Sequence, residues 1–271
     1  MTRLIKKVRF FTLLTLAVIL VLLAVQGPAL APGDPYRIDL LNSLSRPNAG
    51  NLFGTDQLGR DLLSRTLHGA RNSFVLTMVM VLTVTCVGSV IGTVAGFAGG
   101  VTDTIAMQVT DMLLAFPSVV FVIAVAGILG PGIHHTILAL AVICWAKYAR
   151  TARNLVADVR SRVYITQARF GGSRRRQILG KYILPNILPH IAILSTQDIG
   201  EMMITLSALS FLGLTGQPPA PEWGRMLSEN RMYITTYPHL VFIPMLAMLL
   251  YVVVFNLLGD SLRDMLDPKE S

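Results

Sequence analysis

The sequence predicts an all-α membrane protein that crosses the bilayer six times, and three observations support this fold class. Charged residues make up only 14% of the chain, whereas soluble domains carry about 25%. These charges gather between long apolar runs, and 53% of all residues are hydrophobic. A helix needs roughly 20 apolar residues to cross the hydrocarbon core, and six apolar segments are candidates for such helices.

The first expected span covers residues 8–30 and follows a basic start. A cleaved signal peptide is the alternative, because Ala29, Leu30 and Ala31 resemble a cleavage site. The apolar stretch is long for such a peptide, and Pro32 follows the cut directly, so residues 1–31 are interpreted as a cytoplasmic start and a first helix. The polar residues after them are expected outside the membrane, with one or two short helices, over residues 32–72.

A membrane core with five further spans is expected after this segment. Pro117 falls in the first turns of the third span, where a missing amide donor is tolerated. Small residues in the second span allow a close approach of a neighbouring helix. The core is expected over residues 73–260, with spans at 73–97, 112–129, 136–148, 183–212 and 239–258, a basic loop at 149–182 and a charged tail at 261–271.

The distribution of basic residues predicts the orientation. With the N-terminus in the cytoplasm, 16 of the 23 Lys and Arg residues fall in cytoplasmic segments. The positive-inside rule requires such an excess, so both termini are expected in the cytoplasm. The net charge of +8 is therefore interpreted as a topology signal. Nucleic-acid binding is excluded as an interpretation, because no basic patch with interleaved aromatic residues accompanies the charge.

The loop between the fourth and fifth spans carries the most specific local pattern. We expect a helix over residues 160–170, an end to this helix at Gly171 and Gly172, and a second helix over residues 174–182. Leu184 and Pro185 then lead into the fifth span. Such a unit can project from the bilayer and dock in a groove of a partner. The alternative is a solvated basic loop that only sets the topology.

This pattern resembles the cytoplasmic loop of ABC importer permeases, which reads Glu-Ala-Ala, three variable residues, Gly, and later Ile-Leu-Pro. Here the glycine is Gly172 and the second alanine is Ala168, while Thr166 and Gln167 stand in place of Glu and the first Ala. The resemblance implies a coupling helix over residues 164–172 that docks on an ATPase subunit. The coupling residues that it implies are Tyr164, Ala168, Arg169, Gly172 and Pro185.

A second set of residues resembles the dipeptide, oligopeptide and nickel branch of these permeases. The signature is Gly-Thr-Asp followed by Gly-Arg-Asp after the first span, with Pro-Glu-Trp-Gly after the fifth. Asp56, Arg60 and Asp61 can pair in a compact outside segment, and a purely structural role is one interpretation of them. The residues of this extracytoplasmic motif are Gly54, Thr55, Asp56, Gly59, Arg60, Asp61 and Trp223.

Further motifs extend the resemblance over nearly the whole chain. They are Asp-Met-Leu-Leu-Ala-Phe-Pro ending at Pro117, and Asn-Leu-Leu-Gly-Asp ending at Asp260 with a tail to Pro268, which looks closest to the nickel-importer C-type permease. The resemblance implies a type I ABC importer permease fold in the inner membrane, carrying a nickel or other metal chelate or a di- or oligopeptide. It also implies a second homologous permease, two ATPase subunits that hold ATP and Mg, an extracytoplasmic solute-binding protein, surrounding lipid, and no cofactor in this chain.

Ionisable residues in the middle of the fifth span are costly in a membrane and point to a cavity or a partner. On a helix, His190, Gln197 and Glu201 fall within about 40° of one another, and Asp198 lies about 80° from His190. These four residues are the candidates for the translocation pathway, which would favour a cationic or amine-bearing substrate. The alternative is that they pair across the interface with the second permease.

Two other function classes compete with an ABC permease. A secondary transporter or channel could use Asp198 and Glu201, but it needs no coupling loop, and no broken-helix inverted repeat is evident in the sequence. An integral membrane enzyme is excluded as an interpretation, because no metalloprotease, nucleophile-elbow or Walker motif is present. The sequence predicts no metal site, because the adjacent His134 and His135 point apart on a helix.

Overall fold

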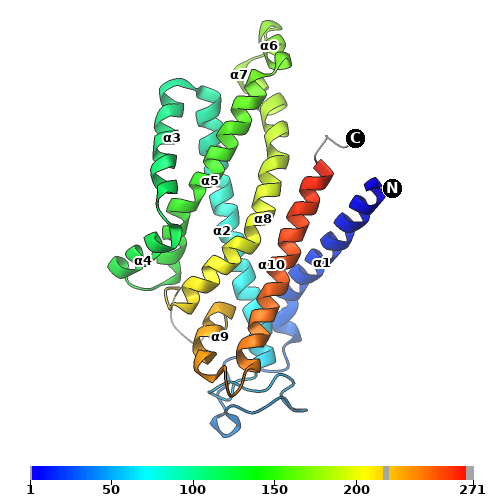
Figure 1. Ribbon diagram of the computed structural model, residues 1–271, viewed down its shortest axis with the longest axis vertical. Helices are drawn as coiled ribbons and strands as arrows, with labels where there is room; N and C mark the ends of the chain where they lie inside the picture. Colours follow the sequence, from blue (N-terminus) through cyan, green and yellow to red (C-terminus); the bar gives the residue numbers. More distant parts are fainter. Residues whose placement is uncertain (1, 216–219, 267–271) are drawn as a thin grey trace.

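The computed structural model describes residues 2–215 and 220–266, and over these ranges it is an elongated helical bundle without a named β-strand (Figure 1). Five helices are long: α1 (Thr2–Leu30), α2 (Leu62–Ala98), α5 (Ile133–Ser161), α8 (Leu184–Phe211) and α10 (His239–Leu266). Five are shorter: α3 (Gly100–Ala115), α4 (Ser118–Leu129), α6 (Val163–Phe170), α7 (Arg175–Ile178) and α9 (Trp223–Asn230). The predicted all-α class is confirmed.

Four helical stretches in the described part of the chain are long and apolar enough to cross a membrane. They contain α1, α2, α8 and α10, and the broken pair α3 and α4 is a fifth crossing if it forms one span. α5 is long but less apolar, because two histidines lie at its start and Lys147 and Arg150 lie in its second half. The predicted count of six spans is therefore not confirmed, and a crossing by α5 stays a prediction.

The third predicted span is wrong in its course. A single helix over residues 112–129 was expected, but α3 begins at Gly100 and ends before Phe116, and α4 leaves at an angle of 84°. Phe116 is extended, with φ −93° and ψ 131°, because the ring of Pro117 disfavours a helical residue before it. Pro117 therefore breaks the segment between two helices.

α2 begins at Leu62, well before the expected start of the second span at residue 73, because Asp61 caps it. The Asp61 carboxylate accepts a hydrogen bond from the Ser64 N–H at 2.7 Å. This cap satisfies one of the four free amides at a helix start.

Aromatic side chains form the centre of the bundle where α2, α9 and α10 meet. The ring of Phe74 stacks on Phe255 with 5.5 Å between centroids, and Trp223 meets Tyr251 edge-on at 5.2 Å. The Tyr251 hydroxyl donates a hydrogen bond to the Leu20 carbonyl at 2.7 Å, which ties α10 to α1. The outer faces of the helices expose many large apolar side chains, as a surface facing lipid or another subunit does.

α2 and α5 approach each other closely along three glycines spaced by four residues: Gly88, Gly92 and Gly96. A Cβ atom at Gly92 would lie 2.8 Å from Ala149 Cα and would overlap the Ala149 carbonyl oxygen. At Gly96 it would lie 2.9 Å from the Arg153 carbonyl oxygen. The predicted close approach of a neighbouring helix to the second span is confirmed, and it is possible because glycine has no side chain.

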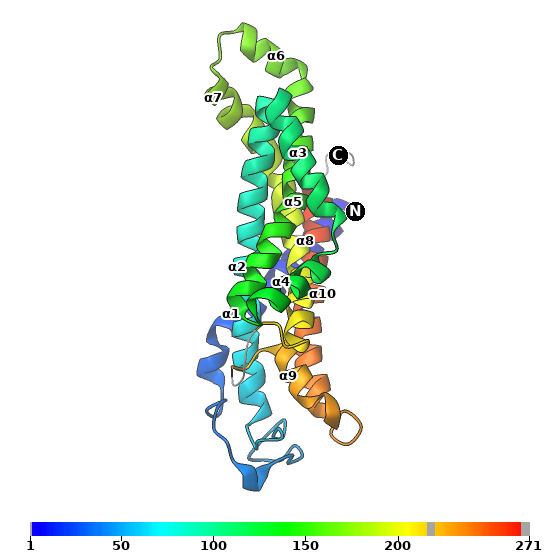
Figure 2. The same ribbon diagram turned by 90° about the vertical axis from the view of Figure 1, so that its left-hand side faces the viewer.

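The two ends of the bundle differ in kind. α6 and α7 form one end, while the segment between α1 and α2 and helix α9 form the opposite end (Figures 1 and 2). The start of α1 and the end of α10 both lie toward the α6 end. Pro268 and the rest of the predicted tail after Leu266 lie outside the described residues.

We predict that Gly92→Ala lowers the free energy of unfolding by about 1–3 kcal/mol, because the added methyl group overpacks the α2–α5 contact. The midpoint of thermal unfolding of the purified protein in detergent measures the effect. The control is Gly127→Ala in α4, where an added Cβ meets no atom within 4 Å. Both changes improve helix propensity equally, so equal midpoints for the two variants would contradict close packing at Gly92.

Candidate functional site

The loop between α5 and α8 is a compact helical unit. α5 continues through Ser161, so the expected helix start at Arg160 is wrong, and α6 begins only at Val163. The chain turns at Arg162, which is extended, and the Arg160 guanidinium donates to the carbonyl of Gly96. The second predicted helix is shorter than expected: α7 ends at Ile178 and continues as a π-helical turn over Leu179–Ile183.

Gly172 ends α6 as the sequence predicts. Its φ of +80° is a left-handed conformation that a side chain disfavours. The N–H groups of Gly172 and Ser173 donate to the carbonyls of Arg169 and Ala168, at 3.1 and 3.0 Å, which satisfies the end of the helix. Pro185 lies in the first turn of α8, where its missing N–H is tolerated, directly after the π turn.

A separate hydrophobic core holds this unit on the bundle. Its members are Val156, Val159, Ile165, Ile178, Ile183 and Ile187, from α5, α6, α7, the π turn and α8. Outside this core, α6 exposes an apolar surface: Val163 is 73% exposed, Tyr164 41% and Phe170 89%. The predicted coupling residues thus lie on or beside one anchored unit that exposes large apolar side chains, and their contact with an ATPase stays a prediction.

The extracytoplasmic motif forms a buried ion-pair cluster at the opposite end. Arg60 Nε lies 2.7 Å from Asp56 Oδ2, and Arg60 Nη2 lies 2.9 Å from Glu229 Oε2 on α9. Arg65 bridges the same two acids at 3.4 and 2.8 Å. The expected pairing of Asp56 with Arg60 is confirmed. The expected pairing of Asp61 is wrong, because the Asp61 side chain caps α2 instead.

Backbone geometry explains the small residues of this motif. Gly54 and Gly59 both have positive φ, and a Cβ at Gly59 would overlap the Asp39 carbonyl oxygen. Thr55 accepts a hydrogen bond from the Ser45 N–H at 2.9 Å and donates to the Asn42 carbonyl. The motif therefore folds the segment before α2 onto itself.

Trp223 is a buried anchor. Its indole N–H donates to the Thr66 carbonyl at 3.1 Å, and its backbone N–H donates to the Ser73 hydroxyl. The preceding Glu222 caps α9. Burial raises the pKa of the Glu222 carboxyl, while hydrogen bonds from the Ser210 hydroxyl and the Gly224 N–H oppose that rise. Trp223 thus holds α9 against α2.

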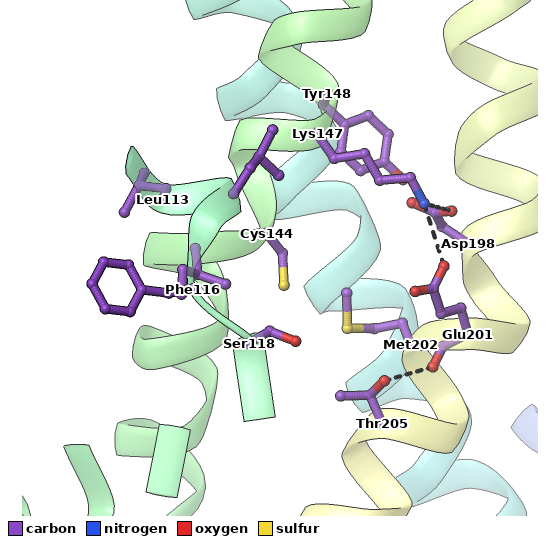
Figure 3. A pocket seen from close by; sticks show the side chains of 12 residues that line it. Leu113, Phe116, Ser118, Cys144, Lys147, Tyr148, Asp198, Glu201, Met202 and Thr205 are labelled. Carbon is purple, nitrogen blue, oxygen red and sulfur yellow. Dashed lines mark hydrogen bonds and ion pairs between the residues drawn. The ribbon is translucent and has the colours of Figure 1, made fainter. Parts of the chain in front are cut away.

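Two of the predicted pathway residues meet a cation of the same chain. Lys147 Nζ on α5 lies 2.8 Å from Asp198 Oδ1 and 3.3 Å from Glu201 Oε2 on α8 (Figure 3). Asp198 is buried, whereas the Glu201 side chain is 73% exposed. These three charged groups line a cavity of about 200 Å³ between the α3–α4 break, α5 and α8.

The other two predicted pathway residues lie elsewhere. The Gln197 amide donates to Asp260 Oδ1 on α10 at 2.9 Å, away from the cavity lining. His190 is exposed, and its Nδ1 lies 3.2 Å from the Asn186 carbonyl oxygen. The predicted pathway residues all lie on α8 but do not share one site, because two of them meet α5, one meets α10 and one is exposed.

Two residues of the ion pairs, Lys147 and Glu229, were not identified from the sequence. Lys147 was assigned to the basic loop, although a lysine in the apolar fourth segment is a signal for a buried ion pair. Glu229 lies 164 residues from Arg65, and no local pattern connects them. Within the described residues, no group of three or more His, Cys, Asp or Glu side chains is placed to hold a metal ion.

Comparison with known proteins finds one family model and many similar permeases. Residues 88–271 match the model described as binding-protein-dependent transport system inner membrane component. The nickel transport system permease protein of Escherichia coli is 39% identical over 255 residues, which are 94% of this chain and 92% of that protein.

Two other relatives have different named cargoes. The probable D,D-dipeptide transport system permease protein of Escherichia coli is 38% identical, over 93% of this chain and 85% of its own length. The glutathione transport system permease protein of Pectobacterium atrosepticum is 39% identical, over 93% and 84%.

We predict that Arg65→Met lowers the free energy of unfolding by about 3 kcal/mol, because it leaves buried carboxylates without one of their cations. Thermal unfolding of the purified protein measures this loss. The control is Arg37→Met, because Arg37 is exposed in the same segment between α1 and α2. An unchanged midpoint for the Arg65 variant would show that Arg60 alone compensates both acids.

Proposed function

We propose, on the premise that this chain belongs to the family of binding-protein-dependent transport system inner membrane components, that it carries a nickel or other metal chelate, or a di- or oligopeptide, by alternating access. As a permease subunit of an ABC importer, it is a multi-pass protein of the inner membrane. The proposal includes two cytoplasmic termini, a second homologous permease, and ATP hydrolysis on two separate ATPase subunits.

The anchored α6–α7 unit carries the proposal. A secondary transporter needs no rigid apolar surface outside the membrane, whereas a subunit driven by ATP hydrolysis elsewhere needs one. α6 offers the exposed Phe170 and Val163 on one side, while Ile165 is fully buried against α5 and α8. A force on this surface would therefore pass directly to the two helices that line the cavity.

The named cargoes of the relatives support two substrate classes. The nickel, D,D-dipeptide and glutathione permeases all align over more than nine tenths of this chain. In our proposal nickel travels as a chelate with a small organic molecule, so both classes present organic groups to the pathway. Selection between them belongs in this proposal to the solute-binding protein.

Uptake in a strain that lacks this chain tests the cargo. We expect restored uptake either of radioactive nickel supplied with histidine as the chelator or of a radiolabelled dipeptide. Inactivation of the partner ATPase should abolish it. Nickel uptake that is unaffected by removing histidine would contradict transport of a chelate. Restoration of neither cargo would contradict both substrate classes.

We predict that Phe170→Ser lowers ATP-driven uptake about tenfold or more, because burying a phenylalanine side chain contributes about 1.5–3 kcal/mol to a contact. Uptake and the amount of copurified ATPase are measured at equal membrane levels of the permease. Leu41→Ser is the matched control, because Leu41 is 98% exposed at the opposite end of the molecule. Equal uptake by the two variants would contradict coupling through α6.

A further inference from the structure

The cavity beside the α3–α4 break carries an unbalanced charge. Its lining includes one cation, Lys147, and two acids, Asp198 and Glu201. The lysine ammonium compensates only one carboxylate, so one negative charge remains on this wall. Ionisable groups at membrane depth are costly, and they face a water-filled cavity or a functional pathway.

The two acids differ in how firmly they are paired. Asp198 is 7% exposed and lies closer to the ammonium, at 2.8 Å. A buried carboxylate without its cation is strongly destabilising, so Lys147 and Asp198 form the structural pair. Glu201 lies 3.3 Å away, and its side chain is 73% exposed. Glu201 is therefore the less firmly held and more exposed of the two carboxylates, and it is the one that can meet another cation.

Two further features of the lining bear on what the cavity can hold. Tyr148 borders the cavity, and its buried hydroxyl lies beside the Thr85 and Asp198 side chains. Figure 3 shows it on the side of the cavity where Asp198 lies. The last turn of α3 also borders the cavity at Leu113 and Leu114, and the carbonyls at a helix end carry partial negative charge.

The rest of the lining is mostly apolar, apart from the hydroxyls of Ser118 and Thr205, and it limits what can enter. Leu113, Phe116, Ile143 and Met202 form walls around the charged groups. The volume of about 200 Å³ is below the roughly 300–1,000 Å³ of sites that enclose a whole small molecule. The cavity in this chain therefore accommodates one end of a cargo molecule.

We propose that this cavity receives a cationic end of the cargo, with Glu201 as its acceptor and the Lys147–Asp198 pair as its fixed support. The inference rests on the proposed function, because it specifies which part of the cargo this chain contacts. The favoured class bears a protonated amine, such as the amino terminus of a peptide, or is a chelate with net positive charge. Chelates with net negative charge are disfavoured.

The charge preference of the cavity is measured with a cysteine reporter in the assembled transporter. Thr205→Cys places a thiol in the lining, in a background of Cys86→Ser and Cys144→Ser. A cationic trimethylammonium methanethiosulfonate and an anionic sulfonate methanethiosulfonate are compared. We expect the ratio of cationic to anionic modification rates to exceed that of a free thiol by on the order of tenfold.

Two variants assign this preference to one residue. Glu201→Gln should reduce the ratio to that of a free thiol. Asp158→Asn should leave it unchanged, because Asp158 is an exposed acid at the far end of α5, paired with Arg162 at 2.7 Å. An unchanged ratio in Glu201→Gln would overturn the proposal. Loss of the second permease from the purified Glu201→Gln complex would also overturn it, by assigning Glu201 to an interface.

Uptake separates this inference from the proposed function. If the reporter behaves as expected but the unmodified transporter carries neither the dipeptide nor the nickel–histidine complex, the substrate classes are wrong and the cation site stands. If the unmodified transporter carries one of them and Glu201→Gln carries it equally well, the cation site has no part in transport and the inference fails.

Discussion

A backbone in lipid has no water with which to pair, and this constraint determines the architecture of the chain. The described segments of membrane-spanning length and composition are helices, whose amides and carbonyls pair internally. Among the described residues, the sharp break between two apolar helices at Phe116 and Pro117 borders a cavity lined by α5 and α8. Irregular backbone at membrane depth is tolerated where protein or a water-filled space covers it. The helix break and the three charged side chains therefore border the same cavity, where each can be satisfied.

The close contact between α2 and α5 joins the two ends of the molecule. α2 begins in the buried cluster of Asp56, Arg60, Arg65 and Glu229. α5 carries Lys147 into the cavity and then leads into the α6–α7 unit. Because the backbones of the two helices nearly touch, the buried ion-pair cluster and the α6–α7 unit belong to one continuous packed structure.

Local patterns in the sequence predicted those features that are formed by residues close together in the chain. The end of α6 at Gly172 needs only a left-handed residue, and the pair of Asp56 with Arg60 is formed within four residues. The 84° break was missed, because a proline near a helix start is compatible with a straight helix as well. Lys147 pairs with residues 51 and 54 positions away, and such contacts follow only from the fold.

The glycine contact between α2 and α5 restricts which amino acids α2 can carry on this side. At Gly92 the neighbouring atoms are main-chain atoms of Ala149, and at Gly88 and Gly96 they include the carbonyls of Trp145 and Arg153. Every amino acid on α5 has a backbone carbonyl, whereas on α2 only glycine leaves room for that carbonyl. Sequence variation on this seam is therefore restricted on α2 to glycine, because the main chain of α5 occupies the space that a side chain would need.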